Sequence, residues 1–201
     1  MPFAVDTDEV TNYELGWKTQ LFDNQLQLNG NAFFVEIERL QTTIFDPSIT
    51  NLFFSDNAAN AEILGVEGDV IFAPYSIEGL TLAGAFSVLD TEVKEVLTPT
   101  NDVIAGSELA FAPTFQGNVR ARYEWSLSPD LRAHLQSQVV YSGSSYSDII
   151  EINKAKVNAW TTVSASFGVA GEKWSMEIFG ENLGNTYGEL ANNFVNDILF
   201  F

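Results

Sequence analysis

The sequence predicts an all-β protein built as an antiparallel up-and-down sheet of about eight strands. Three observations support this prediction. Apolar and polar residues alternate along most of the 201-residue chain, short and long connections alternate, and aromatic residues gather beside the short ones. Alternation with a period of two is typical of strands whose two faces meet different surroundings, and no window of similar length keeps the 3.6-residue spacing of a helix.

Each expected strand has about 9–14 residues and carries an apolar set on alternate positions. In the second strand the phase changes, because Val35 and Ile37 are apolar while Glu36 and Glu38 are charged, and this predicts a bulge or a change of face near Phe33. The apolar sets in chain order begin with Tyr13, Leu15, Trp17 and Leu21, then Leu26, Leu28, Gly30, Ala32 and Phe34, then Leu64, Val66, Gly68, Val70 and Phe72, then Leu80, Leu82, Gly84, Phe86 and Val88. The later sets are Phe115, Gly117, Val119, Ala121, Tyr123 and Trp125, then Leu131, Ala133, Leu135, Val139 and Tyr141, then Val163, Ala165, Phe167 and Val169, then Trp174, Met176 and Ile178.

The connections between these strands alternate in length. The short ones are expected at Phe22–Gln25, Ala73–Gly79, Ser126–Asp130 and Ala170–Lys173. The long ones are expected at Asp46–Ala61, Lys94–Pro113, Gly143–Asn158 and from Leu183 onwards. In an up-and-down sheet this alternation places all short turns at one rim and all long loops at the other. Transmembrane β-barrels show this asymmetry, with short periplasmic turns and long external loops.

The aromatic residues agree with a membrane-spanning barrel. Trp17, Tyr123, Trp125 and Trp174 all lie within a few residues of a short turn, and we interpret them as membrane-interface aromatics. Aromatic side chains collect at such interfaces because one part prefers hydrocarbon and another prefers water. The chain has no stretch of about 18 apolar residues, so the sequence predicts no transmembrane helix, but a spanning strand needs only about 9–11 residues.

Composition and motifs argue against several other functions. With 9 Lys and Arg against 27 Asp and Glu, the formal charge is -18, and a nucleic-acid partner is excluded because it requires a basic surface. The chain has no Cys and a single histidine, His134, and it contains no hydrolase, metalloprotease or phosphate-loop motif. We therefore expect no enzyme, no catalytic residue, no cofactor and no metal site, and we interpret the acidic residues on the loops as solvated charge.

Three segments resemble one protein family. Residues 60–70 read NAEILGVEGDV, and with the short turn and GLTLAGAFS after it they resemble a hairpin in the C-terminal barrel half of TonB-dependent outer-membrane receptors. Residues 174–187 read WSMEIFGENLGNTY and are similar to a late strand of that family, and YELGWK at 13–18 is similar to its usual strand entry. The resemblance covers about Tyr13 to Tyr187.

The resemblance implies the C-terminal part of a 22-stranded barrel over residues 1–201, with the N-terminal plug domain and the final strand absent. It implies active uptake of a ligand such as a ferric siderophore across the Gram-negative outer membrane. The implied partners are outer-membrane lipid, the TonB complex acting through the plug, the barrel-assembly machinery and the ferric chelate. Candidate ligand contacts are the loop aromatics Phe53, Phe54, Tyr146 and Trp160, because an aromatic side chain on a loop is well placed to contact a ligand.

One alternative remains open at this point. A soluble secreted all-β binding module, such as a carbohydrate-binding sandwich, would also show alternating strands and an acidic surface. It would not explain the segregation of short and long connections. The two readings differ in what covers the apolar side of the strands, which is lipid in a barrel and a second sheet in a sandwich.

Overall fold

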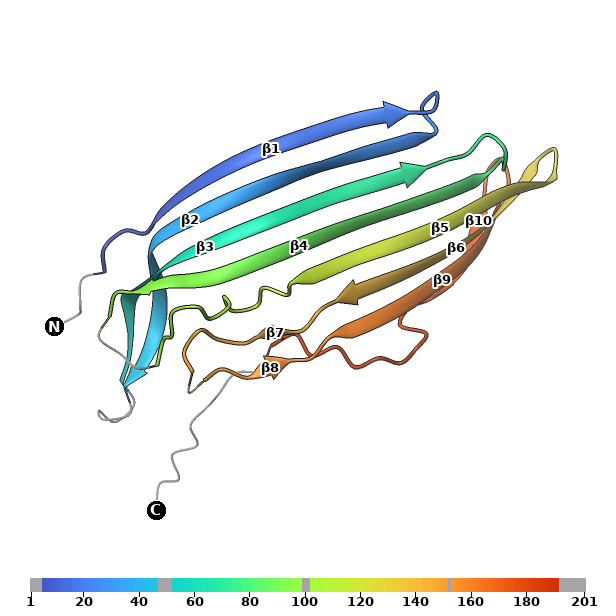
Figure 1. Cartoon of the computed structure of the whole chain (residues 1–201). Coiled ribbons are helices and arrows are strands. Elements are labelled where there is room, and N and C mark those ends of the chain that lie inside the picture. Colours follow the sequence, from blue (N-terminus) through green and yellow to red (C-terminus); the bar gives the residue numbers. More distant parts are fainter. Residues whose placement is uncertain (1–4, 47–51, 99–101, 152, 192–201) are drawn as a thin grey trace, which may run out of the picture.

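The computed structural model describes residues 5–46, 52–98, 102–151 and 153–191, and this part of the chain contains strands and no helix (Figure 1). Eight strands form one antiparallel sheet in the order β1-β2-β3-β4-β5-β6-β9-β10, while β7 and β8 pair separately. The prediction of an all-β chain with about eight sheet strands is confirmed. Among the described residues, no helix is long and apolar enough to cross a membrane. The strands are β1 (Glu9–Leu21), β2 (Leu26–Asp46), β3 (Leu52–Phe72), β4 (Leu80–Val96), β5 (Phe115–Ser128), β6 (Leu131–Ser142), β7 (Ser145–Tyr146), β8 (Lys156–Val157), β9 (Trp160–Ala170) and β10 (Ser175–Gly180).

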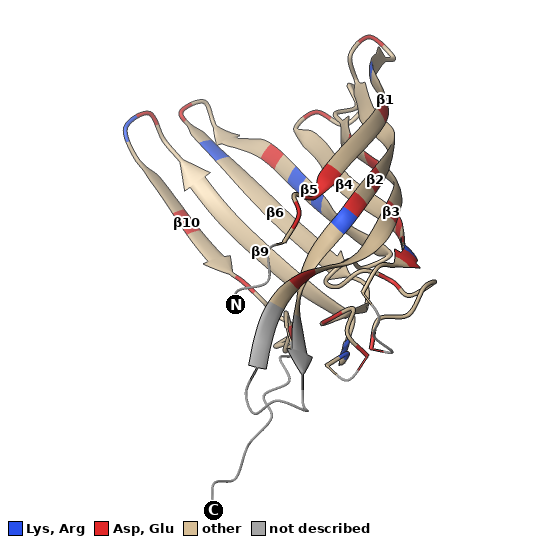
Figure 2. Cartoon of the chain, turned by 90° about the vertical axis from the view of Figure 1, so that its left-hand side faces the viewer, with Lys and Arg blue, Asp and Glu red and all other residues tan. Residues whose placement is uncertain are grey.

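The sheet is an unclosed section of a barrel. It is curved, and its edge strands β1 and β10 lie far apart (Figure 2). The four short turns gather at one end of the sheet and the long connections at the other, as the sequence predicts (Figure 1). At the short-turn end, the hydroxyl group of Tyr75 donates a hydrogen bond to the carbonyl oxygen of Asp23 at 2.7 Å, which ties the turn after β3 to the turn after β1.

The predicted long loop at Asp46–Ala61 is wrong, because β2 and β3 continue as a paired hairpin into this stretch. Both strands have 21 residues, longer than the expected 9–14, and Ile44 still pairs with Phe54. Ala58 and Ala59 are fully buried there. The long connections cover these residues from one side, so the stretch lacks the strict alternation by which a strand is recognised in a sequence.

Of the two alternatives predicted near Phe33, a bulge or a change of face, the bulge is absent at Phe33 itself. Pairing between β2 and β3 is regular through Phe33, and the register shift comes later, between Ile37 and Leu40. Arg39 lies in this shift with a positive φ of 59°, and its backbone N–H donates to the side-chain oxygen of Asn60 at 2.9 Å. From Phe33 to Ile37 the pairing with β3 is therefore regular, and only the chemistry of the two faces changes.

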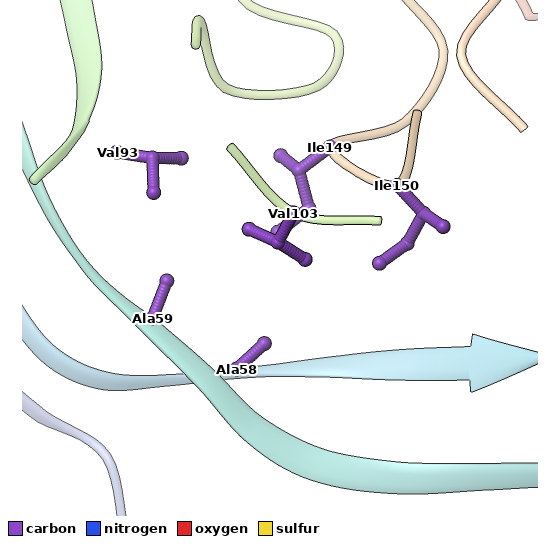
Figure 3. Packing of buried hydrophobic residues seen from close by; sticks show 6 residues of the cluster. All are labelled: Ala58, Ala59, Val93, Val103, Ile149 and Ile150. Atoms are coloured by element: carbon purple, nitrogen blue, oxygen red, sulfur yellow. The ribbon is translucent and has the colours of Figure 1, made fainter. Parts of the chain in front are cut away.

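The buried core lies at the long-connection end of the sheet, and Figure 3 shows its residues from close by. Val103, from the connection after β4, pairs in an isolated β-bridge with Ile150, from the connection after β6. Both pack with residues of β3 and β4 in one cluster that consists of Ala58, Ala59, Val93, Val103, Ile149 and Ile150. We call the described parts of these two connections the loop unit, because they share this core.

The opposite face of the sheet is apolar and uncovered. One row across six strands consists of Leu28, Val70, Gly84, Val119, Val139 and Val163. Val119 is 62% exposed in the middle of the sheet, a position where a sandwich would bury it under a second sheet. We call this the apolar face; its exposed large side chains include Leu15, Trp17, Leu28, Leu64, Val66, Leu82, Phe86, Val119, Tyr123, Leu135, Val139, Val163, Phe167, Met176 and Ile178.

Candidate functional site

The other face of the same strands is polar, as period-two alternation requires. On the β1–β3 side, Asn29 donates to the carboxylate of Asp69 at 3.1 Å, and Asn31 donates to Glu14 at 3.0 Å. We call this the polar face; besides these residues it carries Lys18, Glu67, Gln116, Asn118, Arg120, Arg122, Glu124, His134, Gln136, Gln138, Ser164, Ser166 and Glu177.

The β5–β10 side of the polar face has its own ionic contacts. The guanidinium group of Arg122 donates to Glu124 at 2.8 Å, and His134 Nε2 lies 3.3 Å from Glu177 Oε1. The imidazole ring of His134 lies over Gly168 on the neighbouring strand, where a Cβ atom would collide with it. Among the described residues, Lys18, Glu67 and Arg120 make no hydrogen bond or ion pair through their side chains. These three charges are therefore available to whatever occupies this side of the sheet.

A recess with a volume of about 270 Å³ lies on the polar face next to the loop unit. Ser87, Gln116, Ser142 and Trp160 form one cross-strand row from β4 to β9 and line it. Asn118 belongs to the adjacent row. We call this the Trp160 recess; its polar-face lining consists of Ala85, Ser87, Gln116, Asn118, Val140, Ser142 and Trp160.

The loop unit is held together by backbone hydrogen bonds as well as by its core. The N–H of Glu151 donates to the carbonyl oxygen of Asp102 at 2.7 Å. The N–H of Phe111 donates to the carbonyl oxygen of Tyr146 at 2.8 Å. The N–H of Val93 donates to Ser107 at 2.8 Å, which attaches the unit to β4. Two connections that are distant in sequence therefore form one folded body.

The candidate ligand residues do not share one setting. Phe53 and Phe54 lie in strand β3 rather than in the predicted loop, and their side chains lie outside the described residues. Tyr146 is half-buried in β7, and the ammonium group of Lys154 lies 4.7 Å from the centre of its ring. Trp160 begins β9 and is half-buried on the polar face. Of these four residues, Trp160 is the one that lines the Trp160 recess.

The predicted interface aromatics lie towards the short-turn end of the sheet. Trp17 and Tyr123 belong to the apolar face, and Tyr123 stacks on Trp125 with ring centroids 5.6 Å apart. The centroid of the Trp125 ring also lies 6.2 Å from the centroid of the Phe167 ring in β9. Trp174 directly precedes β10 and is 53% exposed. The arrangement fits the predicted role, which stays a prediction.

The long-connection end of the sheet is strongly acidic, and most of its cations are already paired. Arg39 lies 2.6 Å from Glu9, and Lys94 lies 2.9 Å from Glu92 and 3.4 Å from Glu62. The pKa of Lys94 is raised above its ordinary value, first by its hydrogen bond with Glu92 and then by that with Glu62. No group of three or more His, Cys, Asp or Glu side chains among the described residues could hold a metal ion.

Sequence reasoning missed the Trp160 recess and the core of the loop unit. Gln116 and Asn118 continue the alternation of Arg120 and Arg122 but are uncharged, and this change from charged to neutral polar residues towards the long loop is the signal that could have found the recess. No comparable signal exists for Val103 and Ile150, because their contact depends on two irregular connections meeting in space.

Comparison with protein families gives one match over most of the chain. The family model described as "TonB dependent receptor-like, beta-barrel" matches residues 7–183. Among curated proteins, the metal-pseudopaline receptor CntO of Pseudomonas aeruginosa is 31% identical over 122 residues, which are 61% of this chain and 16% of that receptor. The chain thus spans about one sixth of the length of this relative.

Solved structures show the same fold. The ferric yersiniabactin uptake receptor FyuA from Yersinia pestis superposes with a TM-score of 0.74 at 18% identity, over 94% of this chain and 27% of FyuA. The siderophore receptor PiuA from Acinetobacter baumannii superposes with a TM-score of 0.69 at 18% identity, over 90% of this chain and 25% of PiuA. The chain therefore corresponds to about a quarter of each of these structures.

Proposed function

The chain belongs to the TonB-dependent receptor-like β-barrel family, and from this premise we propose that it forms part of the wall of a receptor that takes up a metal chelate, such as a ferric siderophore, with energy supplied through TonB. Proteins of this family lie in the outer membrane of Gram-negative bacteria, and that is the location of this chain. The functions for which the similar proteins are named, which are uptake of ferric yersiniabactin and reception of metal-pseudopaline, support this class of ligand.

The observation that carries the proposal is the uncovered apolar face. Its large side chains are exposed over the whole width of the sheet, with Leu15 at 75%, Val119 at 62% and Ile178 at 71%. In water such a surface is far larger than a soluble monomer tolerates, whereas in a bilayer it meets acyl chains. The carbohydrate-binding sandwich loses support for the same reason, because the described residues provide no second sheet to cover this face.

The distribution of charge along β2, β3 and β4 agrees with a position in the membrane. On the apolar face, Leu64 is followed towards the long connections by Glu62, which pairs with Glu36 on one side and Glu92 on the other. Between these three glutamates and the long connections, the continuation of the apolar face carries acidic residues. The continuation of the polar face is apolar there, where the loop unit covers it. Such an exchange is expected at the outer surface of a bilayer, because the outside of the wall meets water there.

We infer that the chain is the C-terminal part of the barrel and that the rest of the wall and a plug domain complete the receptor. Among the described residues, β1 and β10 are each paired on one side only, which suits a wall section with neighbours on both sides. The unpaired Lys18, Glu67 and Arg120 on the polar face would then meet the plug, through which TonB acts. The wall itself would not be an enzyme.

For ligand contacts we propose Trp160 first, since it lines a recess on the polar face. Tyr146, Phe53 and Phe54 remain candidates on the same side of the membrane. Trp17, Tyr123, Trp125 and Trp174 are proposed to anchor the wall at the periplasmic interface.

The proposed function can be tested with the full-length protein expressed in a Gram-negative strain that lacks its own chelate receptors. We expect iron uptake from a siderophore mixture to depend on this protein and to disappear in a tonB deletion strain. An empty vector provides the control for background uptake. Folding of the barrel is checked by heat-modifiable mobility of the outer-membrane fraction. Uptake that is equal with and without TonB, from a correctly folded barrel, would contradict the proposal.

A further inference from the structure

We propose that the Trp160 recess binds an uncharged hydrogen-bonding group of the ligand, with a flat part of the ligand against the indole ring. The ligand handled by this part of the wall is then neutral or cationic and not a polyanionic chelate. This inference rests on the proposed function, because it names the chemical class of the ligand that the receptor carries.

The lining of the recess suits a neutral polar group. Ser87 and Ser142 provide hydroxyl groups, Gln116 and Asn118 provide amide groups, and Trp160 provides an aromatic wall. None of the described residues that line the recess is charged. Hydroxyl and amide groups can both donate and accept hydrogen bonds, so they can pair with amide, hydroxamate or hydroxyl groups of a ligand. A carboxylate placed there would lose its water without gaining a cationic partner, which is unfavourable.

The indole ring of Trp160 is held in place by the backbone on one side. A Cβ atom at Gly188 would lie 3.3 Å from Cγ of Trp160, so the chain passes close to the ring. Trp160 also pairs with Ser142 in the ladder between β6 and β9. A ring that is fixed before the ligand arrives loses little conformational freedom on binding, and this favours its use as a stacking surface.

The charges around the recess do not favour an anion. On the polar face, Glu67 pairs with Ser87 in the ladder and Arg120 lies two residues from Asn118, and these two charges have opposite signs. Glu189 follows directly after the glycine that contacts Trp160. A ligand with negative charge would therefore find no net positive potential at the recess.

A ligand that approaches the recess from the long-connection end also meets no excess of positive charge. The cations there are Arg39, Lys94, Lys154 and Lys156. Arg39 and Lys94 are paired with carboxylates, and Lys154 lies 2.8 Å from Glu151. In the part of the chain that the structure describes, Lys156 alone among these four makes no ion pair. An excess of carboxylates at the entrance repels anions and raises the local concentration of cations.

The test compares probes that share one iron centre and differ in charge. Ferrioxamine B is cationic, its N-acetyl derivative is neutral and its N-succinyl derivative is anionic, while the ferric hydroxamate centre is the same. Uptake of radioactive iron from each probe, and from anionic ferric citrate, is measured in cells that express the full-length protein, with and without tonB. We expect TonB-dependent uptake of the cationic and neutral forms to exceed that of the succinyl form about tenfold.

Three variants at the recess and one matched control assign the effect to the recess. Trp160→Ala is expected to reduce uptake of the preferred forms about tenfold, Trp160→Phe to retain most of it, and the matched control Trp174→Ala to leave the preference unchanged. Ser142→Lys places a cation in the recess and is expected to shift the preference towards the succinyl form. Heat-modifiable mobility confirms that each variant has folded.

The outcomes separate this inference from the proposed function. TonB-dependent uptake that favours the succinyl form or ferric citrate overturns the inference and leaves the proposed function standing. Uptake of the cationic and neutral forms that is unchanged in folded Trp160→Ala and Ser142→Lys variants overturns the assignment to the recess. If no probe enters in a TonB-dependent manner, the inference is overturned, whereas the proposed function is contradicted only if uptake from the siderophore mixture is also independent of TonB.

Discussion

Removal of one buried side chain should loosen both halves of the loop unit together. Ile150 is fully buried against Val103 of the other connection and against Ala58 and Ala59 of β3. Truncation of a buried isoleucine to alanine costs about 2–5 kcal/mol, depending on how well the neighbours can move into the cavity. The alanines of β3 are short and held by the strand ladder, so they cannot fill it, and we expect a loss of about 3 kcal/mol for Ile150→Ala.

Hydrogen–deuterium exchange of the full-length protein in detergent measures this loss directly. Since about 1.4 kcal/mol changes an opening equilibrium tenfold, we expect exchange in the loop unit to accelerate about a hundredfold. The acceleration should extend to the amide of Val93, which donates to Ser107 across the unit. Ile104→Ala is the matched control, because Ile104 is 50% exposed beside Val103 and its truncation should cost under about 0.5 kcal/mol. Equal effects of the two variants, or acceleration confined to the connection that carries residue 150, would refute the idea of one shared core.

Three further predictions test the two faces of the sheet. Val119→Lys on the apolar face should lower the free energy of unfolding of the barrel by about 2–4 kcal/mol, measured by denaturant titration in lipid. The control Ser164→Lys on the polar face should leave this free energy nearly unchanged. Equal losses for the two variants would count against a lipid-facing surface. Gly65→Val should reduce the folded yield on heat-modifiable gels, because its side chain would collide with the ring of Phe33, and a second substitution, Phe33→Ala, should restore part of that yield. In a variant that keeps only Trp125, brominated phospholipids should quench its fluorescence, and unquenched emission would place it away from lipid.

The position of the membrane could be anticipated only in part from the sequence. The alternation in Leu64, Val66, Gly68 and Val70 identifies both a strand and its lipid-facing side, since a period of two is a local property of the chain. The exchange of apolar and charged residues near Glu36 predicts either a bulge or a change of face when only the sequence is available. The structure shows regular pairing there, because the surroundings of the two faces change while the backbone does not.

The candidate site was harder to anticipate. Trp160 could be singled out as an aromatic residue near a long connection, but its place in β9 and the row that it forms with Ser142, Gln116 and Ser87 depend on the register of four strands. Phe53 and Phe54 appeared to be loop residues because small and polar residues follow them, yet the hairpin of β2 and β3 includes them.

Local patterns of residues are enough to predict most of the strands, the order of short and long connections, the two unlike faces and the family, because each follows from residues that are close together in the chain. The place where the two long connections meet, the extent of the hairpin of β2 and β3, and the neutral polar groups around Trp160 became known from the structure alone. These features depend on contacts between segments far apart in sequence, such as that of Val103 with Ile150, and no local pattern of residues specifies which distant partner a side chain will find.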